Sequence, residues 1–165
     1  MVDWNTVVRN YFRISDPQQQ FQHLAPPAAT EAAIQAVEAD LGVPLPADLR
    51  SFYATCNGVG LGLPDDTDSP RFIRAVEDLP LFVLDARSIF SDTHPDYASR
   101  FLPFLDWENG DVTGYVFEED GTLLPYLVTF MHELYQGSED QDINDFLQPA
   151  ADNLVDLLNP AEEDA

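Results

Sequence analysis

The sequence predicts an α+β fold, in which N-terminal helices and a C-terminal helix pack on an antiparallel β-sheet of about four to six strands. Three observations support this fold class. Helical periodicity dominates residues 3–13 and 30–58, short β-rich runs separated by tight-turn dipeptides follow, and helical periodicity returns after residue 143. Because runs of one type are grouped, the order disfavours alternating βαβ units and a parallel sheet.

The first helix is predicted over residues 3–13. Asp3 is a suitable N-cap, and large apolar or aromatic residues follow it on one face: Trp4, Val7, Val8, Tyr11 and Phe12. Asp16 and Pro17 end this pattern. Residues 18–24 predict either a turn of helix or a loop.

Residues 30–58 predict two short helices joined by a Gly-x-Pro-x-Pro connection. Thr30 is a suitable N-cap for the first helix, and Gly42 stops it because a residue without Cβ enters the left-handed conformation cheaply. Pro46 suits the first turn of the second helix. That helix carries one apolar face, formed by Leu49, Phe52, Tyr53 and Cys56, and it ends at Asn57-Gly58.

Short strands are predicted next. Residues 60–70 predict an acidic loop, and residues 72–76 and 81–84 predict two strands. Residues 85–90 predict one or two helical turns. The three runs 101–106, 112–117 and 123–131 predict an antiparallel meander, since Asn-Gly and Asp-Gly dipeptides separate them.

The closing segment, residues 143–158, predicts a helix that Pro149 bends or splits. Residues 159–165 predict a frayed acidic tail. The length of 165 residues predicts a single domain over 1–165, in which residues 1–27 form an N-terminal helix and linker.

The net charge limits the classes of partner that the protein is expected to bind. The chain holds 30 acidic and 7 basic residues, a formal charge of −23, and it contains no lysine. Such a field repels nucleic acid and anionic membranes and attracts a basic protein. We therefore expect a protein partner and no direct binding to nucleic acid or membrane. The apolar content of 45% and aromatic content of 12% exclude a disordered acidic tail.

No motif for catalysis or metal binding is present, so we expect no enzyme activity, no cofactor and no metal. Residues 140–151 begin like a calcium loop, but Asp145 occupies its glycine position and Ala151 its glutamate position. Cys56 lies on the apolar face of a helix and is predicted to be a core residue. The N-terminus lacks a secretory signal pattern, and no segment has membrane-span length, so a cytoplasmic location is expected.

The chain resembles the SUKH superfamily over about residues 28–158. Two passages carry the resemblance, the connection between the two predicted helices and the first hairpin of the meander. The matching residues are Leu41, Gly42, Pro44, Leu45, Pro46, Asp48, Phe52, Asn57, Gly58, Phe101, Leu102, Pro103, Phe104, Asn109, Gly110, Asp111, Gly114, Tyr115 and Val116. The segment from Ile143 with Phe146 and Leu147 is similar to the family's closing segment.

This resemblance implies a non-catalytic α+β domain. The superfamily includes the yeast cell-wall assembly regulators and many bacterial immunity proteins, which neutralise toxin domains by binding them. Many of those toxins are nucleases. The resemblance therefore implies an immunity-type protein that binds a cognate toxin domain and neutralises it by occlusion, and the acidic charge predicts that this toxin is a basic nuclease. A regulatory or scaffolding module of the same fold is the alternative, and a small unrecognised hydrolase is a third.

Acidic residues and nearby aromatics are the candidate partner-binding sites. They comprise Asp65, Asp66 and Asp68 in the acidic loop, Asp106, Trp107, Glu108, Asp111 and Tyr115 in the first hairpin, and Glu118, Glu119 and Asp120 in the second turn. Trp107 either anchors a partner or packs beneath the hairpin as core. The acidity as a whole either serves a partner or reflects solubility or a salt-rich cytoplasm.

Overall fold

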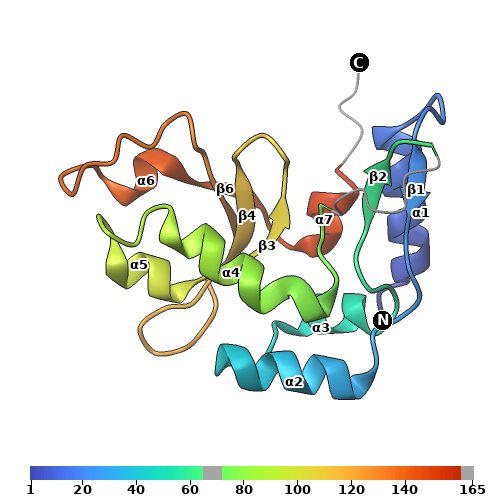
Figure 1. Cartoon of the computed structure of the whole chain (residues 1–165), viewed down its shortest axis with the longest axis horizontal. Helices are drawn as coiled ribbons and strands as arrows, with labels where there is room; N and C mark the ends of the chain where they lie inside the picture. Colours follow the sequence, from blue (N-terminus) through green and yellow to red (C-terminus); the bar gives the residue numbers. More distant parts are fainter. Residues whose placement is uncertain (65–71, 161–165) are drawn as a thin grey trace. The chain divides into compact units, whose positions relative to one another are not determined.

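A computed structural model describes residues 1–64 and 72–160, which divide into two compact units (Figure 1). Unit 1 comprises Met1–Asp78 and the C-terminal residues from Asn153, and unit 2 comprises Leu79–Asp152. Both contain helices and antiparallel strands, which confirms the predicted fold class. The assignment of residues 1–165 to one domain stays a prediction.

Helix α1 (Trp4–Ser15) joins the core of unit 1 through its first residue. The Asp3 side chain caps it by accepting the Thr6 N–H at 3.2 Å. Trp4 is 2% exposed, and its ring meets Phe52 edge to face with a centroid distance of 5.6 Å. The indole N–H donates to the Ser51 hydroxyl at 2.7 Å, so α1 is fixed by both packing and a hydrogen bond.

The two predicted helices of residues 30–58 are α2 (Glu31–Leu41) and α3 (Ala47–Tyr53). Gly42 ends α2 in the left-handed conformation, with φ of 73°, and its N–H donates to the Glu38 carbonyl at 3.0 Å. Pro46 is the N-cap of α3, one position before the predicted first turn. Helix α3 ends at Tyr53, so the expectation that this helix contains Cys56 and ends at Asn57-Gly58 is wrong.

Two further expectations in unit 1 are wrong. Residues 22–24 and 60–62 form a small antiparallel sheet, β1 (Gln22–Leu24) paired with β2 (Gly60–Gly62), and are neither helical turn nor simple loop. Residues 72–76 do not form a strand. Ile73 makes a single bridge to Val59, and the chain then enters the 3₁₀ helix η1 (Val76–Asp78), whose first N–H donates to the Asn57 side chain at 2.7 Å.

Unit 2 contains a four-stranded antiparallel sheet in the order β3-β4-β5-β6. Its strands are β3 (Phe101–Asp106), β4 (Val112–Val116), β5 (Leu127–Phe130) and β6 (Leu147–Ala151). The predicted meander corresponds to β3, β4 and β5 and is confirmed. The pairs Asp106–Val112 and Val112–Phe130 place the end of β3, the start of β4 and the end of β5 next to one another at the same end of the sheet.

Three helices complete unit 2: α4 (Leu79–Ser88), α5 (Pro95–Arg100) and α6 (Ile143–Phe146). Helix α4 contacts β3 and lies across the sheet in the view of Figure 1. Phe90, Phe101, Phe130 and Phe146 are at most 1% exposed and form the aromatic centre of this core. No helix within residues 1–64 and 72–160 is long and apolar enough to cross a membrane.

Two expectations in unit 2 are also wrong. Residues 81–84 belong to α4 and not to a strand, because Leu79, Val83 and Ala86 recur at helical spacing and are buried on one face. The predicted helix over 143–158 divides into α6, strand β6 and helix α7 (Leu154–Leu158), the last of which belongs to unit 1. Pro149 lies in β6, an edge strand, where a residue without N–H is tolerated.

Candidate partner-binding site

The strongest candidate site is the connection between β3 and β4, residues 106–111, which we name the turn site. Its own side chains fix its backbone. The Asp106 carboxylate accepts the Glu108 N–H at 2.8 Å, and the Asn109 amide oxygen accepts the Asp111 N–H at 2.9 Å. Glu108 has a φ of +60°, a conformation that such local hydrogen bonds help to maintain. The turn site is therefore preorganised.

Trp107 presents an aromatic ring at the turn site. It is 40% exposed, yet its indole N–H donates to the Thr113 hydroxyl at 2.8 Å. Thr113 is fully buried, and its hydroxyl oxygen lies 2.6 Å from that of Thr129. The ring is thus attached to the sheet at one edge while much of its surface faces solvent, a position between the two alternatives that the sequence left open.

His132 joins the turn site through Asp111, a contact that the sequence analysis missed. The Asp111 carboxylate accepts the His132 N–H at 3.0 Å and lies 2.7 Å from its ring Nδ1. Gly110 leaves room for this ring, because a Cβ there would lie 2.7 Å from the imidazole. The pairing of Val112 with Phe130 brings these positions together across 21 residues, and no local sequence pattern indicates it.

The charge of the turn site is negative. Asp106, Glu108 and Asp111 contribute three carboxylates, and the exposed Glu133 follows His132 directly. The turn site is distinguished less by its number of charges than by the exposed aromatic ring among them.

A second acidic group, Glu118, Glu119 and Asp120, lies in the loop after β4 and is fully at the surface. Six residues, 112–117, separate it from the turn site, roughly 20 Å along an extended strand. Hydrogen bonds from the Thr122 hydroxyl and N–H, at 2.6 and 2.9 Å, hold the pKa of Asp120 below its ordinary value. Because β4 separates the two acidic groups, they do not form a single site.

The remaining candidates divide into buried and undescribed residues. Tyr115 is 5% exposed and packs on Phe104 with a centroid distance of 5.2 Å, so its side chain belongs to the interior and not to an exposed surface. Asp65, Asp66 and Asp68 of the predicted acidic loop lie outside the described residues.

A small cavity of about 120 Å³ opens on the sheet beside the Glu118 loop, lined by Tyr97, Arg100, Val116, Glu118, Leu124, Tyr126, Val128, Ile143, Asn144, Leu147 and Pro149. Burial alone would lower the pKa of Arg100, but its hydrogen bond and ion pair with Asp96 at 3.1 Å, together with Tyr97, outweigh burial and raise the pKa. The guanidinium also lies over the Tyr97 ring at 4.6 Å. Its positive charge is thus already compensated.

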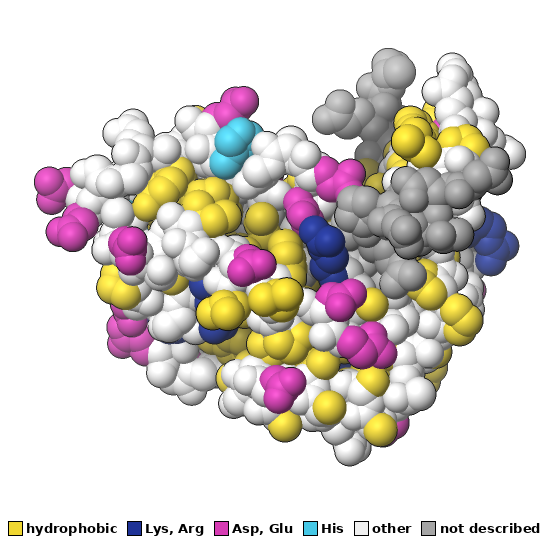
Figure 2. All heavy atoms as spheres, in the orientation of Figure 1, with side chains coloured by type: hydrophobic (Ala, Val, Ile, Leu, Met, Phe, Trp, Pro, Cys, Tyr) yellow, Lys and Arg dark blue, Asp and Glu magenta, His cyan; other side chains and the backbone are white. Residues whose placement is uncertain are grey.

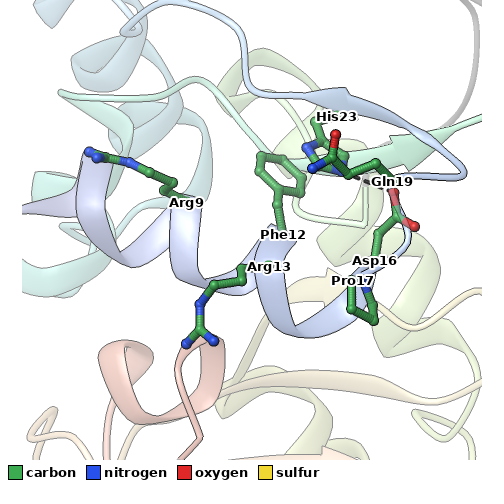
Figure 3. A pocket seen from close by; sticks show the side chains of 7 residues that line it. All are labelled: Arg9, Phe12, Arg13, Asp16, Pro17, Gln19 and His23. Atoms are coloured by element: carbon green, nitrogen blue, oxygen red, sulfur yellow. Dashed lines mark hydrogen bonds and ion pairs between the residues drawn. The ribbon is translucent and has the colours of Figure 1, made fainter.

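A larger cavity of about 370 Å³ lies along α1 in unit 1, lined by Arg9, Phe12, Arg13, Asp16, Pro17, Gln19 and His23 (Figure 3). The His23 ring stacks on Phe12 at 4.4 Å, and its Nε2 lies 3.0 Å from the Asp16 carboxylate. Arg9 and Arg13 extend away from this stacked pair (Figure 3). The polar groups do not converge on one point, so the cavity lacks the arrangement of a catalytic centre.

The described parts of the chain meet neither the requirements of a metal site nor those of an accessible thiol. Within residues 1–64 and 72–160, no group of three His, Cys, Asp or Glu side chains lies close enough to hold a metal ion. Cys56 is buried, as predicted, and its thiol donates to the Gly58 carbonyl at 2.9 Å.

Comparison with known proteins supplies the family. A family model described as the SMI1 / KNR4 family (SUKH-1) matches residues 28–159, which confirms the resemblance drawn from the two motif passages. Helix α1 and strand β1 precede the matched region. No curated protein matches the chain.

Proposed function

Because the chain belongs to the SMI1 / KNR4 family (SUKH-1), we propose that it is an immunity-type protein, which binds a cognate toxin domain and neutralises it by occlusion. The toxin is proposed to be a basic nuclease, and the encounter to occur in the cytoplasm. The observation that carries this proposal is the turn site, where the exposed ring of Trp107 stands among fixed carboxylates.

Electrostatics supports the choice of a basic partner. A nuclease presents positive charge where it holds nucleic acid phosphates, and a protein of charge −23 offers the complementary field. Such complementarity raises association rates by roughly 10- to 1000-fold over a neutral pair. The carboxylates of the turn site would take the place of phosphates on the nuclease surface.

Preorganisation supports the choice of the turn site. Ordering a loop on binding costs free energy, and the hydrogen bonds of Asp106 and Asn109 have already fixed this backbone. The indole of Trp107 is held by Thr113, so its ring requires little further ordering. A rigid aromatic ring with a charged rim has the character of an interface hot spot. Occlusion needs no chemistry from this chain, so we propose that it is not an enzyme.

The decisive experiment is to search the genes adjacent to this one for a toxin-like protein and to co-express the chain with that protein. We expect rescue of growth and a complex that survives gel filtration. If growth is not rescued and no complex survives gel filtration, the proposed function is wrong.

Two variants then locate the contact. Trp107→Ala with Glu108→Lys removes the ring and one carboxylate but leaves the hydrogen-bonding side chains of Asp106 and Asp111 in place. We expect affinity to fall about 30-fold or more. The matched control is Glu119→Lys, an exposed charge reversal at the other end of β4, which should slow association only a few-fold and only at low salt. Equal effects of both variants would exclude a special role for the turn site.

A further inference from the structure

Helix α4 carries apolar side chains on two opposite faces, and only one of these faces is packed. Leu79 and Val83 are 0% and 2% exposed and face the interior. On the other side, Leu81 and Leu84 are 64% and 65% exposed. We name these two residues the α4 outer face.

Helix geometry explains why this face is not buried with the other. Each residue turns a helix by about 100°, so Leu81 points roughly 200° away from Leu79 and cannot share its environment. Single exposed leucines are ordinary, but neighbouring ones on a helix form a patch of the kind that marks binding surfaces. Figure 2 shows apolar side chains exposed over the position of α4, with both acidic and basic side chains beside them.

Two charged residues are exposed in α4 and the turn directly after it, and both are acidic. Asp85 is exposed one helical turn after Leu81, and Asp92 is exposed shortly after Ile89. The basic residue of α4, Arg87, is turned inward, since its Nε donates to the Phe101 carbonyl at 2.7 Å and burial lowers its pKa. An apolar centre with an acidic margin results.

We propose that the α4 outer face is a docking surface for a basic protein, whose apolar patch is bordered by lysine or arginine. The partner's apolar side chains seat on Leu81 and Leu84, and its cations meet Asp85 and Asp92. A second copy of this chain fits poorly, because two molecules of charge −23 repel each other. The identification of this basic partner as a toxin domain rests on the proposed function.

The test uses a double variant in which the change of charge and the loss of apolar contact alter the binding affinity in opposite directions. Leu81→Glu with Leu84→Glu removes the apolar centre and changes the formal charge from −23 to −25. Attraction to a basic partner by charge alone would then increase, whereas docking on an apolar surface would weaken. Glutamate is a good helix former, and Leu81 lies in the first turn of α4, where a negative charge is favourable. Circular dichroism is used to verify that the variant is folded.

The matched control is Ile14→Glu with Leu63→Glu. These residues are 36% and 62% exposed and belong to unit 1, and the substitutions produce the same change of charge. With the toxin-like protein as partner, we expect L81E/L84E to weaken binding at least about tenfold while I14E/L63E binds as the unaltered protein does. If the unaltered protein binds and L81E/L84E binds equally or more tightly, the inference is wrong and the proposed function stands.

A second probe keeps the inference testable if no toxin partner is found. It is a fluorescein-labelled 18-residue helical peptide of leucine and lysine with all leucines on one face, compared with a scrambled peptide of the same composition. We expect the ordered peptide to bind at least about tenfold more tightly, and L81E/L84E to abolish that difference. Equal binding of both peptides would overturn the inference. So would a dimer of the unaltered protein, measured by sedimentation, that L81E/L84E converts to a monomer.

Discussion

At the scale of single residues, the turn site depends on Gly110 as much as on its carboxylates. Gly110 has a φ of +99°, which residues with a Cβ adopt at a cost, and it lies against the imidazole of His132. The same imidazole contacts Asp111, one of the carboxylates proposed to face a partner. A glycine that the sequence marks as a turn residue thus also shapes the candidate site.

We therefore predict that Gly110→Ala destabilises the protein by roughly 2–4 kcal/mol, because backbone strain adds to a clash with the His132 ring. Urea unfolding measures the change. Gly121→Ala is the control, since Gly121 has a φ of +85° but no atom within 4 Å of the added Cβ, and it should cost only about 1 kcal/mol. A cost for Gly110→Ala no larger than that of the control would show that His132 yields without penalty.

At the scale of elements, Asp16 connects α1 to β1. Its N–H donates to the Phe12 carbonyl, and its buried carboxylate accepts the N–H groups of Gln20 and Phe21 at 2.8 and 3.0 Å. Burial raises the pKa of this carboxyl, but these hydrogen bonds and His23 outweigh burial and hold the pKa below its ordinary value. The charged carboxylate therefore stabilises the connection.

The sign of the resulting pH dependence follows from linkage. A carboxyl whose pKa is lower in the folded state stabilises the fold fully above its unfolded pKa of about 3.9 and progressively less as pH falls through the folded pKa. We predict that Asp16→Asn lowers the unfolding free energy at pH 7, and that the difference from the unaltered protein shrinks below about pH 4.

Chemical denaturation at a series of pH values measures that difference. Asp92→Asn, at an exposed position in unit 2, is the control and should change stability little at any pH. A deficit of Asp16→Asn that stays constant down to pH 2 would contradict the assigned role of the charge.

At the scale of the whole molecule, the formal charge of −23 acts on stability as well as on partners. Like charges repel in the compact state, and salt screens this repulsion, since the Debye length falls from about 30 Å at 0.01 M to about 10 Å at 0.1 M. The proposed encounter with a basic protein is screened by the same ions. Salt is therefore expected to stabilise the fold and slow the association.

We predict that the thermal unfolding midpoint rises by about 5 °C or more between 10 mM and 500 mM sodium chloride, corresponding to roughly 2 kcal/mol for a chain of this size. Circular dichroism measures the midpoint. Reversing Glu118, Glu119 and Asp120 to lysine changes the formal charge from −23 to −17 and should reduce this rise. A midpoint independent of salt in both proteins would show that self-repulsion is not a significant cost of folding.

The sequence by itself determined the elements whose cause is local. Caps and breakers set the limits of α1 and α2, turn dipeptides placed the hairpins of β3, β4 and β5, and two motif passages indicated the family that the model over residues 28–159 then showed. These features depend on residues within a few positions of each other, so one chain read in order contains their cause.

Only the tertiary structure decided the features that depend on distant pairing. The β1–β2 sheet, the strand β6 around Pro149 and the contact of His132 with Asp111 each join residues far apart in the chain. The run 81–84 has strand-like composition, yet burial of Leu79 and Val83 on one face made it helical. Strand pairing and burial stabilise a segment only through its contacts with other segments, so the sequence of one segment does not reveal them. The same contacts decide that Trp107, Leu81 and Leu84 face solvent while Tyr115 does not.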